Sequence, residues 1–225
     1  MRRLHTSIWR EIYLSADILD DLQDGDLDLE PHRLLAPLTS MRGLARVMDL
    51  ARTAPQPSAV LTILARTIEE LVQAQATDLA PESAHARQLV VSLESRTGAT
   101  LGGMLEMLAG FSPGDTTWSG HYCRWGRQLG AALQWRSDLD AATEAGPGSN
   151  RWRLLMRTLE GLGLEQPAPD GMVLATVRLR LVQLRDSLMG SLTATQPAEV
   201  VSAFEEALQV ALDLRLAERR LECRS

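Results

Sequence analysis

Four aspartates near the N-terminus are spaced for cation chemistry. Asp17, Asp20, Asp21 and Asp24 fall in one predicted helix, over about residues 7–24. Asp20 and Asp24 are four residues apart, so on a helix their carboxylates point the same way and repel by roughly a few tenths of a kcal/mol. Mg²⁺, which prefers carboxylate oxygen, would offset that repulsion. The alternative is a solvated acidic helix end, although the apolar residues of this stretch favour a core helix.

A second polar pair lies in the middle of the chain. Gln134 and Asp138 share one face of a helix predicted over about residues 118–143, after a turn of small and apolar residues at 129–133. Alone, this pattern is also typical of an ordinary helix with a polar end. Together with the acidic helix, it could supply the opposite wall of a site for a metal and a diphosphate.

The composition excludes several kinds of chemistry. All 23 basic residues of the 225 are Arg, so no Schiff base, Walker-type phosphate lysine or lysine general base can form. The net charge of −6 argues against sequence-independent nucleic-acid binding, which needs a basic surface. Cys123 and Cys223 are 100 residues apart, and neither has the spacing of a zinc site or a disulfide scaffold.

The hydropathy pattern predicts neither a membrane span nor a leader. No window of about 18 uncharged apolar residues occurs, and no apolar signal-peptide core precedes Glu11. We therefore expect a cytoplasmic protein.

Apolar residues recur every three or four positions, which predicts an all-α protein. After the first helix, further helices are expected over about residues 34–51, 58–79, 86–109, 118–143, 151–162, 171–191 and 198–222. Loops longer than a few residues occur only between helices, with no internal domain boundary, so residues 1–225 are predicted to form a single domain. Some helices are apolar on more than one face, as at 101–109, which favours a bundle around a central cavity.

Four motifs along these helices resemble those of the trans-isoprenyl diphosphate synthases, or polyprenyl synthetases. Residues 20–24, Asp-Asp-Leu-Gln-Asp, match the first aspartate-rich motif, DDxxD. Residues 74–79 resemble GQxxDL with Ala for Gly, and 96–99 resemble KTGA with Arg for Lys. Residues 129–138 resemble GxAFQxxDD, the second aspartate-rich motif. The resemblance implies an isoprenoid synthase-type helical bundle around a central cavity.

The resemblance also implies roles for individual residues toward an allylic prenyl diphosphate and Mg²⁺. The implied catalytic residues are Asp20, Asp21, Asp24, Thr97 and Gln134, and the implied metal ligands are Asp20, Asp24 and Asp138. Arg96, Gln75 and Asp78 would contact the substrate, with Arg96 touching the diphosphate. Oxygens of Thr97 and Gln134 would stabilise the allylic cation.

Two further expectations come from the family. In the family, the length of the prenyl product is set by bulky residues before the first aspartates. Tyr13 could therefore close the cavity floor under a short substrate. The family usually forms homodimers, so we expect a homodimer, or a heteromer with a related synthase.

The sequence departs from the family at the site for isopentenyl diphosphate, the usual second substrate. Leu29 and Glu30 stand where the family has paired arginines, and only 19 residues precede Asp20, so the family's first helices and their Gly-Lys-Arg motif are expected to be missing. A site without these cations would bind a diphosphate poorly. Ser137 and Ala141 also replace aspartates of the second motif.

Two hypotheses follow. In the first, the protein is a Mg²⁺-dependent prenyltransferase that ionises an allylic diphosphate and passes the cation to another acceptor, or lets it cyclise. In the second, it is a catalytically idle homologue that acts as a partner subunit or binds lipid. Retention of the DDxxD carboxylates, Thr97 and Gln134 favours activity, whereas Ser137 and the short N-terminus favour the idle homologue. A start codon further upstream is a third explanation for the missing helices.

Overall fold

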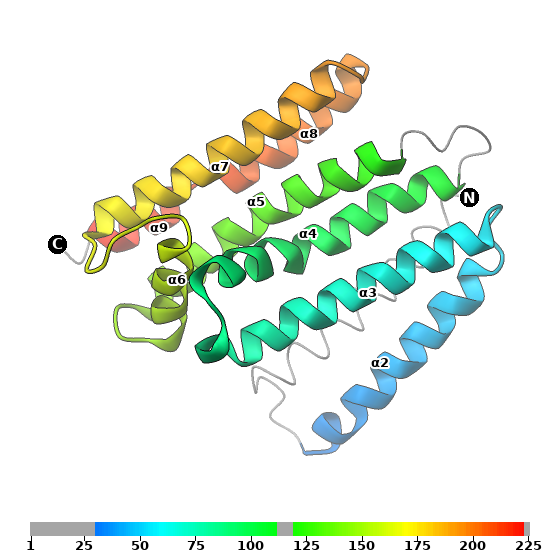
Figure 1. Cartoon of the computed structure of the whole chain (residues 1–225), viewed down its shortest axis with the longest axis horizontal. Helices are drawn as coiled ribbons and strands as arrows, with labels where there is room; N and C mark the ends of the chain where they lie inside the picture. The colour runs from blue at the N-terminus through cyan, green and yellow to red at the C-terminus, as the bar shows by residue number, and fades with distance from the viewer. Residues whose placement is uncertain (1–29, 112–118, 223–225) are drawn as a thin grey trace. The chain divides into compact units, whose positions relative to one another are not determined.

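The structure is a computed structural model that describes residues 30–111 and 119–222 (Figure 1). The described residues form helices and no strand, so the all-α prediction is confirmed for them. The α-helices are α2 (Glu30–Ala51), α3 (Pro57–Leu79), α4 (Ala86–Phe111), α5 (Ser119–Ala145), α6 (Asn150–Glu160), α7 (Asp170–Thr193), α8 (Ala198–Leu212) and α9 (Arg215–Glu222), with a 3₁₀ helix at Pro81–Ser83.

Helices α2 to α7 begin and end within about one turn of the predicted positions. The helix predicted over about residues 7–24 lies outside the described residues. None of the described helices is long and apolar enough to cross a membrane, in agreement with the sequence prediction.

The prediction of a single helix over 198–222 is wrong, because the helix is interrupted between α8 and α9. Asp213 leaves the helical conformation, with φ −79° and ψ 92°. Its Oδ1 accepts hydrogen bonds from the backbone N–H of Arg215 at 3.2 Å and from Arg215 Nε at 2.8 Å. An Asp side chain that binds a nearby backbone N–H competes with the helix, which the apolar period cannot reveal.

The chain divides into two compact units, and the prediction of a single domain stays a prediction. The first unit comprises residues 1–65 and 106–119. Its described part contains α2, residues 57–65 of α3, residues 106–111 of α4 and the first residue of α5. Val47, Val60 and Leu64 are among its buried residues.

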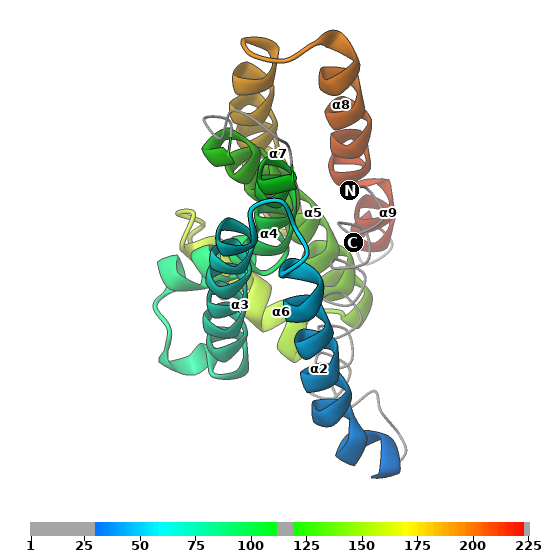
Figure 2. The ribbon, with the colours of Figure 1, turned by 90° about the vertical axis from the view of Figure 1, so that its right-hand side faces the viewer.

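The second unit comprises residues 66–105 and 120–225 and holds the rest of the helices. Helices α7 and α8 lie side by side and run in opposite directions (Figures 1 and 2). Helix α7 turns one apolar stripe inward, with members three or four residues apart, as expected of a bundle helix. These are Val173, Val177, Leu181, Leu184, Leu188 and Leu192.

Helices α4 and α5 approach so closely that their backbones touch. Gly98 and Gly102 on α4 face Gly126 and Gly130 on α5, each pair being four residues apart. A Cβ atom added to Gly126 would lie 2.2 Å from the carbonyl oxygen of Leu101, and one added to Gly130 would lie 2.5 Å from that of Thr97. Real Cβ contacts are never this short, so the crossing requires glycine. We call these four glycines the glycine contact.

Candidate functional site

The glycine contact sets Thr97 of α4 beside the polar face of α5. Thr97 Oγ1 donates a hydrogen bond to Gln134 Oε1 at 2.5 Å. Gln134 Nε2 donates in turn to Asp138 Oδ1 at 2.6 Å, one helical turn further on. Residues of the two segments that resemble KTGA and the second aspartate-rich motif are thus joined in one chain of hydrogen bonds.

Arg96 extends this chain to a third helix. Its Nη1 donates to Asp78 Oδ2 at the end of α3, at 3.1 Å, and its Nη2 donates to Asp138 Oδ2. The side chains of Arg96, Asp78 and Asp138 are 22%, 28% and 22% exposed, so the cluster is half-buried. We call Asp78, Arg96, Thr97, Gln134 and Asp138 the Arg96 cluster.

The cluster combines one guanidinium with two carboxylates. Burial raises the pKa of the Asp138 carboxyl above its ordinary value, while the charge of Arg96 and the hydrogen bond from Gln134 oppose that rise. Both oxygens of Asp138 already accept hydrogen bonds, one from each of these residues. Such charge-assisted bonds are the strong ones in a half-buried site.

The other residues implied by the resemblance are placed as follows. Gln75 is half-buried on α3, one turn before Asp78. Asp20, Asp21, Asp24 and Tyr13 lie outside the described residues. Ser137 is exposed on α5.

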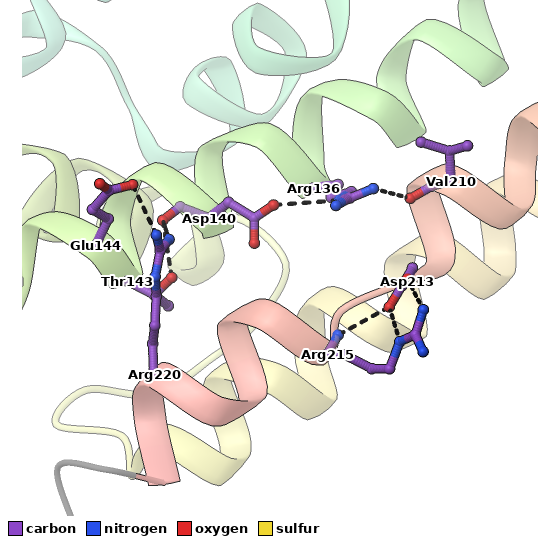
Figure 3. Close-up of polar contacts among 8 residues, drawn as sticks. All are labelled: Arg136, Asp140, Thr143, Glu144, Val210, Asp213, Arg215 and Arg220. Carbon is purple, nitrogen blue, oxygen red and sulfur yellow. Dashed lines mark hydrogen bonds and ion pairs between the residues drawn. The ribbon is translucent and has the colours of Figure 1, made fainter.

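Asp140, one position out of register with the second motif, faces α8 and α9 rather than the Arg96 cluster. Its Oδ2 accepts from Arg136 Nε at 3.3 Å, and Arg136 Nη1 donates to the carbonyl oxygen of Val210 (Figure 3). From α9, Arg220 donates to the carbonyl oxygen of Asp140 at 2.9 Å and to Glu144 Oε2 at 3.0 Å. Asp140 therefore helps to hold the C-terminal helices against α5.

A second polar cluster, around Glu94 of α4, was missed by the sequence analysis. Glu94, two residues before Arg96, accepts two hydrogen bonds from Arg180 of α7, at 2.6 and 2.7 Å. It also accepts from the indole of Trp135 at 2.9 Å. Trp135 and Trp125 are fully buried, as expected of core tryptophans. No spacing rule could have found the pairing of Glu94 with Arg180, because the two are 86 residues apart.

An open groove of about 620 Å³ runs beside α3 and α4. Its lining includes Glu70, Thr77, Arg87, Ser92 and Arg127. No member of the Arg96 cluster is among its described lining residues, so this groove is not the predicted cavity around the site.

Two carboxylates, those of Asp78 and Asp138, meet at Arg96. The described residues contain no group of three or more His, Cys, Asp or Glu side chains that could hold a metal ion together. Asp78 and Asp138 nevertheless offer carboxylate oxygens, the ligands that Mg²⁺ prefers. Compared with models of protein families, with characterised proteins and with solved structures, the chain matches none.

Proposed function

We propose that this protein is a Mg²⁺-dependent, prenyltransferase-like isoprenoid synthase that binds and ionises an allylic prenyl diphosphate and uses an acceptor other than isopentenyl diphosphate. One observation supports the proposal. Residues of three separate motifs, at Asp78, at Arg96 and Thr97, and at Gln134 and Asp138, meet in one half-buried cluster from three helices. Those are the positions at which the family resemblance implies diphosphate and cation contacts.

Each residue of the cluster has chemistry suited to that reaction. Asp138, with Asp20 and Asp24, would hold Mg²⁺, which neutralises the charge of a departing diphosphate. Arg96 would donate charge-assisted hydrogen bonds to the diphosphate oxygens. The Thr97 hydroxyl donates its hydrogen bond to Gln134 Oε1, so its lone pairs point away from that bond and could stabilise positive charge.

A second candidate is a catalytically idle homologue that binds lipid or serves as a partner subunit. The observation in its favour is that Arg96 pairs with both Asp78 and Asp138, so no metal is needed to satisfy these carboxylates. In that case the cluster would act only to fasten α3, α4 and α5 together.

Diphosphate release separates the two candidates. The full chain is incubated with geranyl, farnesyl or geranylgeranyl diphosphate and Mg²⁺, with and without isopentenyl diphosphate. We expect release without isopentenyl diphosphate, and its loss in Asp20→Ala and Asp24→Ala. Asp186→Asn removes a carboxylate on the exposed side of α7, where the side chain is 61% exposed, and should release diphosphate at the rate of the unchanged protein.

The other outcomes are equally informative. No release together with no Mg²⁺-dependent binding of any of the three diphosphates would leave only the idle homologue. Elongated products would show that isopentenyl diphosphate is the acceptor after all.

A further inference from the structure

The two ends of the Arg96 guanidinium are held by different carboxylates. Nη1 is bound to Asp78 on α3 and Nη2 to Asp138 on α5. We propose that Arg96 occupies the metal position at Asp138 until a diphosphate arrives, so that metal and diphosphate enter the site together. The proposal rests on the proposed function for the identity of these ligands.

Competition at Asp138 follows from its contacts. Oδ1 accepts from Gln134 at 2.6 Å and Oδ2 accepts from Arg96, so both oxygens are engaged. A divalent cation at Oδ2 has to displace the guanidinium, because two positive groups that close together repel strongly in a half-buried site. In the absence of diphosphate, the Arg96 guanidinium therefore lowers the affinity of Asp138 for a metal ion.

Asp78 determines where the displaced arginine goes. Its bond to Nη1, at 3.1 Å, is independent of Asp138 and can keep the side chain in the site when Nη2 leaves. The backbone at this point is fixed, since the neighbouring Gly98 lies against the backbone of Arg127 on α5. The released Nη2 then needs an anion, and the planar guanidinium suits phosphate oxygens.

When a metal ion takes Asp138 from Arg96, the diphosphate can replace Asp138 as the anion that binds Arg96 Nη2. Each ligand increases the affinity for the other, and the coupling must be the same in both directions. Without Arg96, the coupling through this residue is lost and metal binds to Asp138 unopposed.

Mn²⁺ binding to the full chain tests this, with free Mn²⁺ followed by electron paramagnetic resonance. Titrations are made with and without inorganic diphosphate, and corrected for the Mn²⁺ that diphosphate binds in the absence of protein. In the unchanged protein we expect weak binding of Mn²⁺ alone and tighter binding with diphosphate. In Arg96→Met, the affinity for Mn²⁺ alone should rise about tenfold, and the gain in Mn²⁺ affinity from diphosphate should shrink.

Two variants control for charge and for folding. Arg87→Met removes the same charge from an exposed position of α4 and should leave Mn²⁺ affinity unchanged. Arg96→Lys keeps the positive charge, but a single ammonium does not reproduce the two-ended fork, so its Mn²⁺ affinity should be intermediate. If Arg96→Met does not fold, Arg96→Lys can be used instead. Mn²⁺ alone should raise the Tm of Arg96→Lys more than that of the unchanged protein.

The outcomes separate this inference from the proposed function. Unchanged or weaker affinity for Mn²⁺ alone in the Arg96 variants would overturn the inference. The inference would also be overturned if the higher affinity of Arg96→Met for Mn²⁺ alone persisted in the double variant Arg96→Met, Asp138→Asn. Failure of the unchanged protein to ionise any allylic diphosphate would overturn the proposed function, whereas a gain in Arg96→Met would still support the role of Arg96 at Asp138.

Discussion

Single carboxylates bind side chains from two or three helices in this protein. Glu94 accepts hydrogen bonds from Arg180 on α7 and from Trp135 on α5, and its side chain is only 20% exposed. Removing one partner of such a group leaves the others unsatisfied, which is more costly than the loss of the bond itself.

Glu94→Gln should therefore lower the free energy of unfolding by about 2 kcal/mol, because a neutral amide replaces a carboxylate that binds a guanidinium at two points. Urea denaturation of the two proteins measures the difference. Glu165→Gln, at an exposed position between α6 and α7, should stay within about 0.5 kcal/mol of the unchanged protein. Equal losses in both variants would contradict the role given to Glu94.

Asp213 gives a prediction about pH. Hydrogen bonds from the side chain and the backbone of Arg215 hold the pKa of this carboxyl well below its ordinary value. A lowered pKa in the folded state means that the ionised form stabilises the fold above the ordinary carboxyl pKa of about 4, and that this stabilisation is lost as the pH falls.

Asp213→Asn should accordingly be less stable than the unchanged protein at pH 7, and the difference should shrink as the pH falls below about 4. Denaturation of both proteins over pH 2–7 measures it, and the other titrating groups cancel in the comparison. A difference that does not vary with pH would mean that the charge of Asp213 is not involved.

Among the elements, the crossing of α4 and α5 is the one that shapes the candidate site. Its glycines let the helix that carries Arg96 and Thr97 touch the helix that carries Gln134 and Asp138. A methyl group at Gly126 would meet the carbonyl oxygen of Leu101, which is backbone and cannot rotate away.

Gly126→Ala should lower the free energy of unfolding by about 2 kcal/mol or more, since the helices must move apart. Gly190→Ala is the matched control within α7. Nothing lies within 4 Å of a Cβ added there, so alanine's better helix propensity should raise stability by up to about 1 kcal/mol. Calorimetry or urea denaturation distinguishes a loss from a gain, and a gain in Gly126→Ala would contradict the close crossing.

The helices themselves were predictable from the sequence, but the way they cross was not. The spacing of apolar residues identifies α2 to α7 as helices, because each of them buries at least one stripe of apolar side chains. The same spacing continues through residues 198–222, where the local bond from Arg215 to Asp213 breaks the helix. The residues at 129–133 were recognised only as small and apolar, because spacing does not say which backbone a glycine will meet.

For the molecule as a whole, the residues of the candidate site that belong to motif-like segments were predictable from the sequence. The ion pairs that join them were not. Thr97, Gln134 and Asp138 were expected to lie near one another, and they share hydrogen bonds. The pairing of Arg96 with both carboxylates was not foreseen, because the resemblance assigned this arginine to a diphosphate. Which of the 23 arginines meets which acid depends on the packing of distant segments.

Stability should be uneven across the molecule. Helix α9 has eight residues, and Arg220 fastens it to α5 through the carbonyl oxygen of Asp140 and the carboxylate of Glu144 (Figure 3). Short elements held by a few contacts open locally at lower free energy than core helices do.

Arg220→Ala should speed amide hydrogen exchange in α9 while leaving exchange near the glycine contact of α4 and α5 unchanged. Exchange followed by mass spectrometry resolves the two regions. Arg219→Ala, at the exposed neighbouring position, should change neither. Faster exchange throughout the chain would show that α9 is part of the global unfolding unit.

The glycine contact also makes the width of the candidate site adjustable. The separation of α4 and α5 depends on four positions that have no side chain, and none of them belongs to the Arg96 cluster. Alanine at Gly130, beside Thr97, would act as a spacer that moves Thr97 away from Gln134 without changing any polar group. A graded series of such spacers would relate the width of the site to the size of the ligand it accepts.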